Sequence, residues 1–478
     1  MAVLRVVALA SAVLFSSACA TIDPRDDFEQ VARTVAERSG EKISWRELDA
    51  DGEDDGLVRE LLDKDLDERS AVRVALARSP RLQALYEELG IGRADVARAS
   101  RLPNPILDAE VRFPEGGGRS ALELSLVEDF VSVLTLPLAR GRAESALEST
   151  RLAVTREVLA TIGLVRSLFR DWQAAEQIVE LQSNVLDTLT AASELAQRIH
   201  AAGNLRALDL ANERVQAEEA RLALAAAQSE AAVARARVDG ALGLWGEEAR
   251  WRGVARLSDP EHEPVSLERA ENRAIESSLD LALERTSMEA AARTLGIAES
   301  LRFLADGQIG IAAERESEDG EWGVGPALSI PLPLFDGGAA RVLAGRAALR
   351  QRGSLYAAAA IEIRAEVRAF AAKLQNAQAR AQHLRSVVLP LRRQVVEETQ
   401  LQYNAMQVGA FELLQARRAE IESGIDWIES VRNYWHSRDA LELLWSGVRP
   451  AMEAQIPSSM ADRMTGAGAA ERTKGDDR

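Results

Sequence analysis

The stretch that decides the fold is residues 361–395, IEIRAEVRAFAAKLQNAQARAQHLRSVVLPLRRQV. Its apolar residues recur at alternating steps of four and three, which is the heptad spacing of helices that pack along a narrow seam. The seam consists of Ile363, Val367, Phe370, Leu374, Ala377, Ala381, Leu384, Val388, Leu391 and Val395. The stretch therefore predicts part of a very long helix. Pro390 should bend this helix without ending it, because the seam continues on both sides.

A second seam with similar spacing lies upstream, running from Val158 through Phe169 to Val179. The two long helices are predicted at about residues 139–201 and 339–407, and each is about 100 Å long at 1.5 Å per residue. Each is followed by a glycine, Gly203 or Gly409, and then by more helical sequence. This is the pattern of an antiparallel helical hairpin. Helices of this length do not fit inside a compact domain.

Two pairs of strand patterns are flanked by long helices. The strands are predicted at about residues 106–114, 121–128, 308–316 and 322–331. Apolar and polar residues alternate along them; Leu107, Ala109 and Val111 share one face, while Asp108 and Glu110 share the other. A transmembrane β-strand needs this alternation, with lipid on one side and a polar lumen on the other. A half-buried soluble hairpin has the same pattern.

The order of helix, two strands, long helix, turn and helix occurs twice, which indicates an internal duplication. The two repeats are residues 69–245 and 267–447, and residues 246–266 form the linker. The other segments are predicted to be a signal peptide, an acidic extended segment and a disordered tail, at residues 1–18, 19–68 and 448–478. Residues 19–68 are predicted to be extended because the run of acidic residues in this segment cannot pack.

The N-terminal segment has the features of a secretory signal. Arg5 precedes an apolar stretch that is too short to span a membrane, and small residues follow it up to Cys19. Cys19 stands where bacterial lipoproteins carry their lipid, and Ala20 after it favours delivery to the outer membrane. An ordinary signal peptide with an incidental cysteine is the alternative. The location expected is the bacterial outer membrane, lipid-anchored and extending into the periplasm.

Composition excludes several classes of function. The 478 residues carry a net charge of −17, which disfavours nucleic-acid binding, and the single cysteine cannot form an internal disulfide. The four histidines are dozens of residues apart, so no short metal-ligand motif exists. No phosphate-binding loop, nucleophile elbow or Cys/His pair is present. We therefore expect no catalytic residue, no metal, no cofactor and no enzyme activity.

Four amphipathic strands cannot close into a membrane barrel, and open strand edges are not tolerated in lipid. Several chains must therefore share one barrel. Three chains of four strands give twelve strands, an even number within the range of outer-membrane barrels. The long helices of the same trimer would be enough to form a hollow tube.

The sequence resembles the outer membrane efflux protein family, the TolC-like channels of tripartite pumps, across about residues 70–446. The resemblance rests on four motifs: SPRL at 79–82, LPNP at 102–105, PLPLFDGG at 331–338 and YNAMQVGAFELL at 403–414. It implies a mainly α chain with four β-strands. As a homotrimer, this chain forms a 12-stranded outer-membrane barrel on a periplasmic α-helical barrel. It further implies a passive exit duct that docks onto a periplasmic adaptor protein and an inner-membrane, proton-driven pump. The lipoprotein-like start resembles the lipid-anchored branch of the family.

The resemblance also assigns candidate residues. The two helical turns become periplasmic tips that meet the adaptor, comprising Gly203, Asn204, Leu205, Val408, Gly409, Ala410 and Phe411. The alternative is that both glycines simply end helices in a left-handed conformation. Asp209 and Glu412 are candidates for polar groups at the entrance, although charge at a helix N-terminus is also favourable for local reasons.

Three tryptophans receive separate predictions. Trp322 is the candidate aromatic residue at the membrane interface, where indole rings prefer to lie; the alternative is an ordinary strand residue. Trp245 and Trp445 end their helices and are predicted to be packing anchors.

A different class of protein remains open, namely a long periplasmic coiled-coil scaffold without a pore. The exported cargo, whether a drug, a metal cation or another molecule, is not determined by the sequence.

Overall fold

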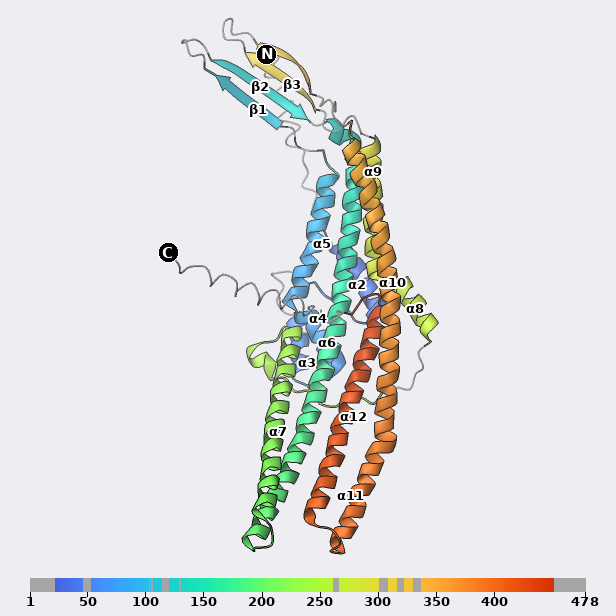
Figure 1. Ribbon diagram of the computed structural model, residues 1–478. Helices are drawn as coiled ribbons and strands as arrows, with labels where there is room; N and C mark the ends of the chain where they lie inside the picture. The colour runs from blue at the N-terminus through green and yellow to red at the C-terminus, as the bar shows by residue number, and fades with distance from the viewer. Residues whose placement is uncertain are drawn as a thin grey trace, which may run out of the picture.

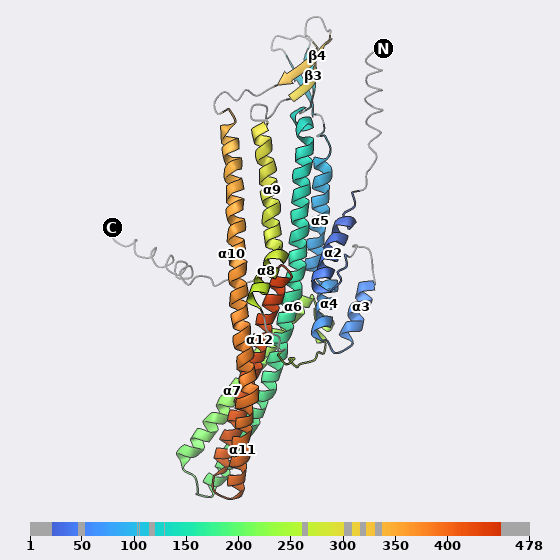
Figure 2. The ribbon, with the colours of Figure 1, turned by 90° about the vertical axis from the view of Figure 1, so that its right-hand side faces the viewer.

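The computed structural model describes residues 22–45, 53–102, 104, 106–113, 120–128, 130–260, 266–300, 308–315, 322–329 and 337–450. The molecule is a long helical rod with a β-sheet at one end and two helical hairpin tips at the other (Figure 1). Short helices surround the rod near its middle (Figure 2). The predicted class, mainly α with four β-strands, is confirmed for the single chain.

Each half of the chain has a strand pair, a long helix and a returning helix, in that order. The first half contains α2 (Arg25–Ser39), α3 (Glu53–Leu62), α4 (Glu68–Arg78), α5 (Pro80–Ala99), β1 (Ile106–Arg112), β2 (Ala121–Glu128), α6 (Phe130–Ala201), α7 (Ala207–Leu242) and a 3-10 turn (Gly246–Arg250). The second half contains α8 (Leu267–Ser277), α9 (Leu279–Ser300), β3 (Gln308–Arg315), β4 (Trp322–Ser329), α10 (Ala339–His383), a π-helical turn (Leu384–Val388), α11 (Leu389–Asn404) and α12 (Ala410–Trp445).

Helix α6 is longer than the sequence predicts. It has 72 residues, which makes it about 108 Å long, and it begins at Phe130 rather than near residue 139. Pro137 lies inside it, where its ring removes one backbone hydrogen bond. Helix α9 packs along this part of α6, and Arg293 donates to the Gly141 carbonyl oxygen at 2.6 Å. Tertiary contacts thus outweigh the local tendency of the proline to end or kink the helix.

The second rod continues through Pro390. The π-helical turn ends at Val388 and α11 starts at Leu389, so Pro390 lies in the first turn of the new segment. A helix needs no backbone N–H donor at that position. The π-helical turn shifts the backbone hydrogen-bond register, so the helical rod continues past Pro390.

The seam that runs through residues 361–395 is buried over only part of its length. Ile363, Val367 and Leu374 are at most 3% exposed. Beyond the π-helical turn, Leu391 is 55% exposed and Val395 is 48% exposed. Within one chain the seam is therefore fully packed only before the π-helical turn.

The acidic N-terminal segment was expected to be extended, and this prediction is wrong for most of its described residues. Arg25–Ser39 and Glu53–Leu62 are helices. On α2, Val31 and Val35 are fully buried, and Phe28 packs edge-to-face against Tyr86 of α5. Apolar residues at helical spacing therefore outweigh the overall acidity of the segment.

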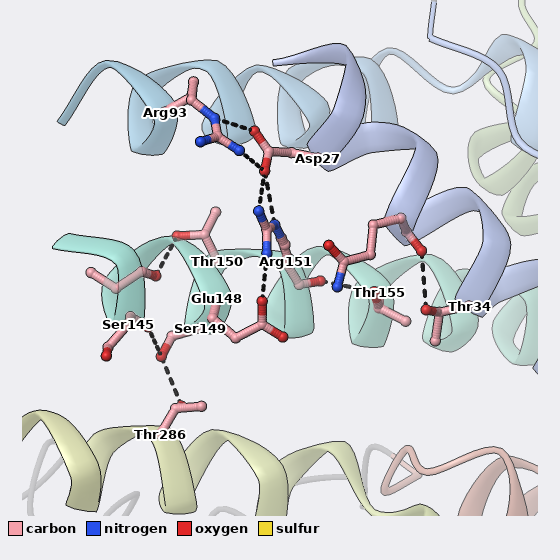
Figure 3. A network of polar contacts seen from close by, with 12 residues as sticks. Asp27, Thr34, Arg93, Ser145, Glu148, Ser149, Thr150, Arg151, Thr155 and Thr286 are labelled. Atoms are coloured by element: carbon pink, nitrogen blue, oxygen red, sulfur yellow. Dashed lines mark hydrogen bonds and ion pairs between the residues drawn. The ribbon is translucent and has the colours of Figure 1, made fainter. Parts of the chain in front are cut away.

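Helix α2 ties the rod together through a buried carboxylate (Figure 3). Asp27 is 0% exposed and accepts hydrogen bonds from Arg93 of α5 at 2.6 and 2.7 Å and from Arg151 of α6. At the other end of α2, Arg38 donates to the carbonyl oxygens of Ser277 and Ser446, both at 2.7 Å. Because these carbonyls end α8 and α12, one short helix connects both halves of the chain.

Candidate functional site

The four strands form one antiparallel sheet in the order β1-β2-β3-β4. The two strand pairs are therefore joined, because β2 pairs with β3, with Leu126 opposite Ile311. The outer edges of β1 and β4 have no strand partner among the described residues.

One face of this sheet is apolar across all four strands. The register aligns Leu107 with Leu126 and Ile311, and Ile311 with Pro326. Eight large side chains on this face are at least 46% exposed: Leu107, Val111, Leu126, Ile309, Ile311, Trp322, Val324 and Leu328. Leu122 and Leu124 of β2, on the same face, are half-buried. An exposed apolar surface of this extent marks contact with a membrane or another protein.

The opposite face is polar or small except for the Ile106–Val127 pair at the helix end of β1 and β2. It carries Asp108, Glu110, Glu123 and Glu314, and Arg112 is bonded to Glu110 at 2.8 Å and to Glu123 at 3.0 Å. Four carboxylates against one guanidinium leave this face negatively charged. The remaining positions on β3 and β4 include Gly310, Gly323, Gly325 and Ser329.

Trp322 lies on the apolar face, at the end of β4 away from the helices, and is 47% exposed. Phe113 follows β1 at the same end of the sheet and is 80% exposed. Aromatic rings at the rim of an apolar band are typical of a membrane interface.

The first hairpin turn connects α6 to α7 at the tip. Gly203 has φ +81°, so it adopts the left-handed conformation expected of a helix-ending glycine. His200 Nδ1 lies 2.7 Å from the Leu205 carbonyl oxygen and fixes the turn. Asn204 is exposed and Leu205 is half-buried.

The second turn connects α11 to α12 and is built differently. Gly409 has φ −82° and is the N-cap of α12, so the left-handed alternative is wrong for this glycine. The left-handed residue is Met406, with φ +58° and 94% exposure. Ala410 and Phe411 belong to the first turn of α12. Val408, Ala410 and Phe411 are half-buried.

The two predicted entrance carboxylates make local contacts. Asp209 accepts hydrogen bonds from Arg206 at 2.8 and 2.9 Å, and this partner lowers the pKa of Asp209. The Glu412 carboxylate lies beside Gly409 at the start of α12, where negative charge is favourable. The two hairpins meet farther from the tips, where Arg418 donates to Gln216 at 3.2 Å.

The structure tests two of the three remaining predicted residues, Cys19, Trp245 and Trp445. Cys19 lies outside the described residues. Trp445 is half-buried and packs in the core of the second half, but Trp245 is 76% exposed, so its predicted role as a packing anchor is wrong. Trp251, 3% exposed, packs on Trp172 instead, at 4.8 Å between ring centroids. A buried aromatic in the linker has no periodic signal that could have revealed it.

No group of three or more His, Cys, Asp or Glu side chains in the described part of the chain could hold a metal ion. Among the described helices, none has a stretch that is long and apolar enough to cross a membrane.

Comparison with known proteins gives relatives of one kind. No family model matches the sequence. The cobalt-zinc-cadmium resistance protein CzcC of Cupriavidus metallidurans is 23% identical over 373 residues, covering 75% of this chain and 85% of CzcC. The structure of CusC, studied for its formation of a transmembrane channel, superimposes with a TM-score of 0.64 at 16% identity, covering 81% of this chain and 93% of CusC. The open MtrE outer membrane channel of Neisseria gonorrhoeae superimposes with a TM-score of 0.60 at 16% identity, covering 80% and 89% of the two chains.

The chain therefore has the fold of outer-membrane channel proteins. The predicted resemblance is confirmed at the level of the fold, because the solved structures that the chain matches include the outer-membrane channels OprN and MtrE.

Proposed function

We propose that three copies of this chain form an outer-membrane channel that serves as the passive exit duct of an efflux system. The observation that carries the proposal is the sheet, with one exposed apolar face, one polar face and two unpaired outer edges within the described residues. Pairing β4 of one copy with β1 of the next satisfies the backbone groups of both edges. Three copies then close a twelve-stranded barrel, apolar toward lipid and polar toward the lumen.

The remaining parts of the proposal concern attachment and partners. Cys19 carries a lipid that adds a second hold on the outer membrane. The tips at Gly203–Leu205 and Val408–Phe411 dock onto a periplasmic adaptor protein, and an inner-membrane, proton-driven pump supplies the energy. The position of both tips at the end of the rod opposite the sheet supports this arrangement (Figure 1).

The sheet assignment can be tested with two neighbouring residues of β2. Leu124 lies on the apolar face and Ser125 on the polar face, and both are half-buried. Leu124→Arg should lower the yield of membrane-inserted trimer, because an arginine facing the bilayer midplane costs about 2–4 kcal/mol. Ser125→Arg should insert normally and reduce single-channel conductance to cations. A scaffold without a pore would purify without detergent and show no conductance, which would overturn the proposal.

We further propose divalent metal cations as cargo. The name of the relative CzcC and the four carboxylates on the polar face of the sheet support a cationic cargo. Loss of the gene should increase the sensitivity of the host to cobalt, zinc or cadmium. If sensitivity to all three metals were unchanged and sensitivity to organic dyes increased, the cargo would be organic molecules and the proposal of metal cations would be wrong.

A further inference from the structure

A pocket of about 320 Å³ lies where the end of α2 meets α6, α8 and α12. Its lining includes four arginines, Arg38, Arg166, Arg273 and Arg438, and two carboxylates, Asp439 and Glu442. The chain as a whole has 75 acidic and 58 basic residues. The charged side chains of the pocket lining are instead mainly basic, opposite in sign to the net charge of the chain.

Two of these guanidinium groups, those of Arg38 and Arg273, have no ion pair among the described residues. Arg38 donates to two neutral carbonyl oxygens, and burial lowers its pKa. Arg166 forms two long ion pairs, with Glu68 at 3.6 Å and Glu442 at 3.9 Å, and both are beyond hydrogen-bond distance. Arg273 lies over the Trp445 ring at 5.3 Å, and its guanidinium has no ion pair in the described part of the chain.

Two buried polar atoms at the same pocket also have no hydrogen-bond partner in the described structure. They are Nε1 of Trp445 and Oδ2 of Asp439, which is only 8% exposed. Buried polar groups are nearly always hydrogen-bonded, so each of these atoms calls for a partner such as an ordered water or a bound ion. The free groups are mainly donors, since a guanidinium has five N–H groups and an indole has one.

Asp439 differs from these groups because an ionised carboxylate accepts hydrogen bonds and does not donate them. Its Oδ1 is bonded to Arg170 of α6, and Glu442, Arg166 and Glu68 also lie near it. Burial raises the pKa of Asp439.

We propose that this pocket binds a small oxyanion of the phosphate or sulfate type. Planar guanidinium groups match the geometry of such oxygens, and an anion neutralises charge that the described chain leaves unpaired. The volume holds the anion together with several waters, at about 30 Å³ for each water. Arg166 is 36 residues from the start of α6, about 54 Å from its sheet end. With the sheet in the membrane, as proposed above, the anion is therefore a free solute rather than a lipid headgroup. Binding there joins α2, α6, α8 and α12 at the middle of the rod.

The test is calorimetric titration of the full chain in detergent with inorganic phosphate, with chloride of equal ionic strength as reference. Arg166→Gln should weaken phosphate binding by about ten- to a hundredfold, the value of one charge-assisted hydrogen bond. Trp445→Phe keeps the ring, removes the N–H and should weaken binding by several-fold. Sulfate should compete with phosphate, and chloride should not.

Arg198→Gln is the matched control. Arg198 is on the same helix, its side chain is 80% exposed, and it lies 3.7 Å from Glu194. The control should bind phosphate as the parent chain does, and circular dichroism without phosphate should show equal helix content in all variants. Absence of phosphate binding in the parent chain, or equal weakening in Arg198→Gln, would overturn the proposal.

Discussion

At the scale of single residues, buried ion pairs hold the middle of this rod together. The Asp27 carboxylate is completely buried and lies between Arg93 and Arg151, which belong to two different helices. A buried charge is tolerated only when it is paired and hydrogen-bonded. The position of α2, and with it the connection between the two halves, therefore depends on these contacts.

Asp27→Asn should lower the stability of the folded chain by about 3 kcal/mol, because it leaves two guanidinium groups without their shared partner. Thermal unfolding followed by circular dichroism measures the loss. Glu60→Gln is the control, since the Glu60–Lys64 pair is about two-thirds exposed and exposed ion pairs contribute little to stability. Equal effects of the two substitutions would contradict a special role for Asp27.

The same carboxylate predicts a pH dependence. Burial alone raises the pKa of Asp27, but the hydrogen bonds and charges of Arg93 and Arg151 bring it below the ordinary value of 3.8. An aspartate whose pKa is lowered on folding stabilises the fold fully at neutral pH, and this contribution is lost as the pH falls below about 4. The stability difference between parent and Asp27→Asn should therefore shrink between pH 5 and about pH 2. A constant difference over this range would contradict the assignment.

Gly447 is the second residue on which this junction depends. Its φ is +97°, and a Cβ atom there would collide with the Ser277 carbonyl oxygen and with Arg38. Gly447→Ala should cost more than about 1 kcal/mol in unfolding free energy. Gly353→Ala, in open space on α10, should stabilise the helix by about 0.5–1 kcal/mol. Thermal unfolding of both variants should show shifts of opposite sign.

At the scale of elements, the two hairpins have similar positions but different turns. Gly203 is needed for its positive φ, whereas Gly409 has an ordinary φ and Met406 takes the left-handed conformation. The sequence pattern is nearly the same in both hairpins, a glycine between two helices. The backbone nevertheless forms the two turns in different conformations. A substitution at Gly409 consequently reports on contacts of the tip rather than on strain.

Gly409→Leu should reduce export while leaving trimer and membrane insertion intact. The nearest atom to an added Cβ is the flexible end of Glu412, so folding tolerates the change, but a bulky side chain obstructs docking of an adaptor. Cargo efflux from whole cells is the measurement. Gly240→Leu, on α7 with open space around it, is the control and should export normally. Unchanged export by Gly409→Leu would mean that this turn is not the docking tip.

At the scale of the whole molecule, the single chain leaves apolar helix surface uncovered. Leu391, Val395 and Leu401 on α11 are 48–62% exposed, as are Leu208, Val215 and Leu222 on α7 at 54–72%. Coiled-coil seams of this kind are stable when a second helix covers them. Neighbouring copies of the chain supply that helix in the proposed trimer.

The double substitution Leu391→Asp with Val395→Asp should therefore convert trimer to monomer without lowering the helix content of the monomer. Mass measurement of the detergent-solubilised protein distinguishes the two states. Glu397→Lys, also exposed on α11, is the control and should remain trimeric. A trimer that survives the double substitution would show that α11 does not lie between copies.

The sequence by itself determined the helical rods, the four strands with their two faces and the order of elements in each half, because heptad and period-two patterns are local and repeat many times. It could not determine that α2 is helical and buried, that α6 continues through Pro137 or that Met406 rather than Gly409 is left-handed. These features follow from contacts between residues far apart in the chain, such as Asp27 with Arg93 and Arg151. The arginine pocket likewise collects side chains from four helices. No sequence pattern brings such residues together, since only tertiary packing sets their distances.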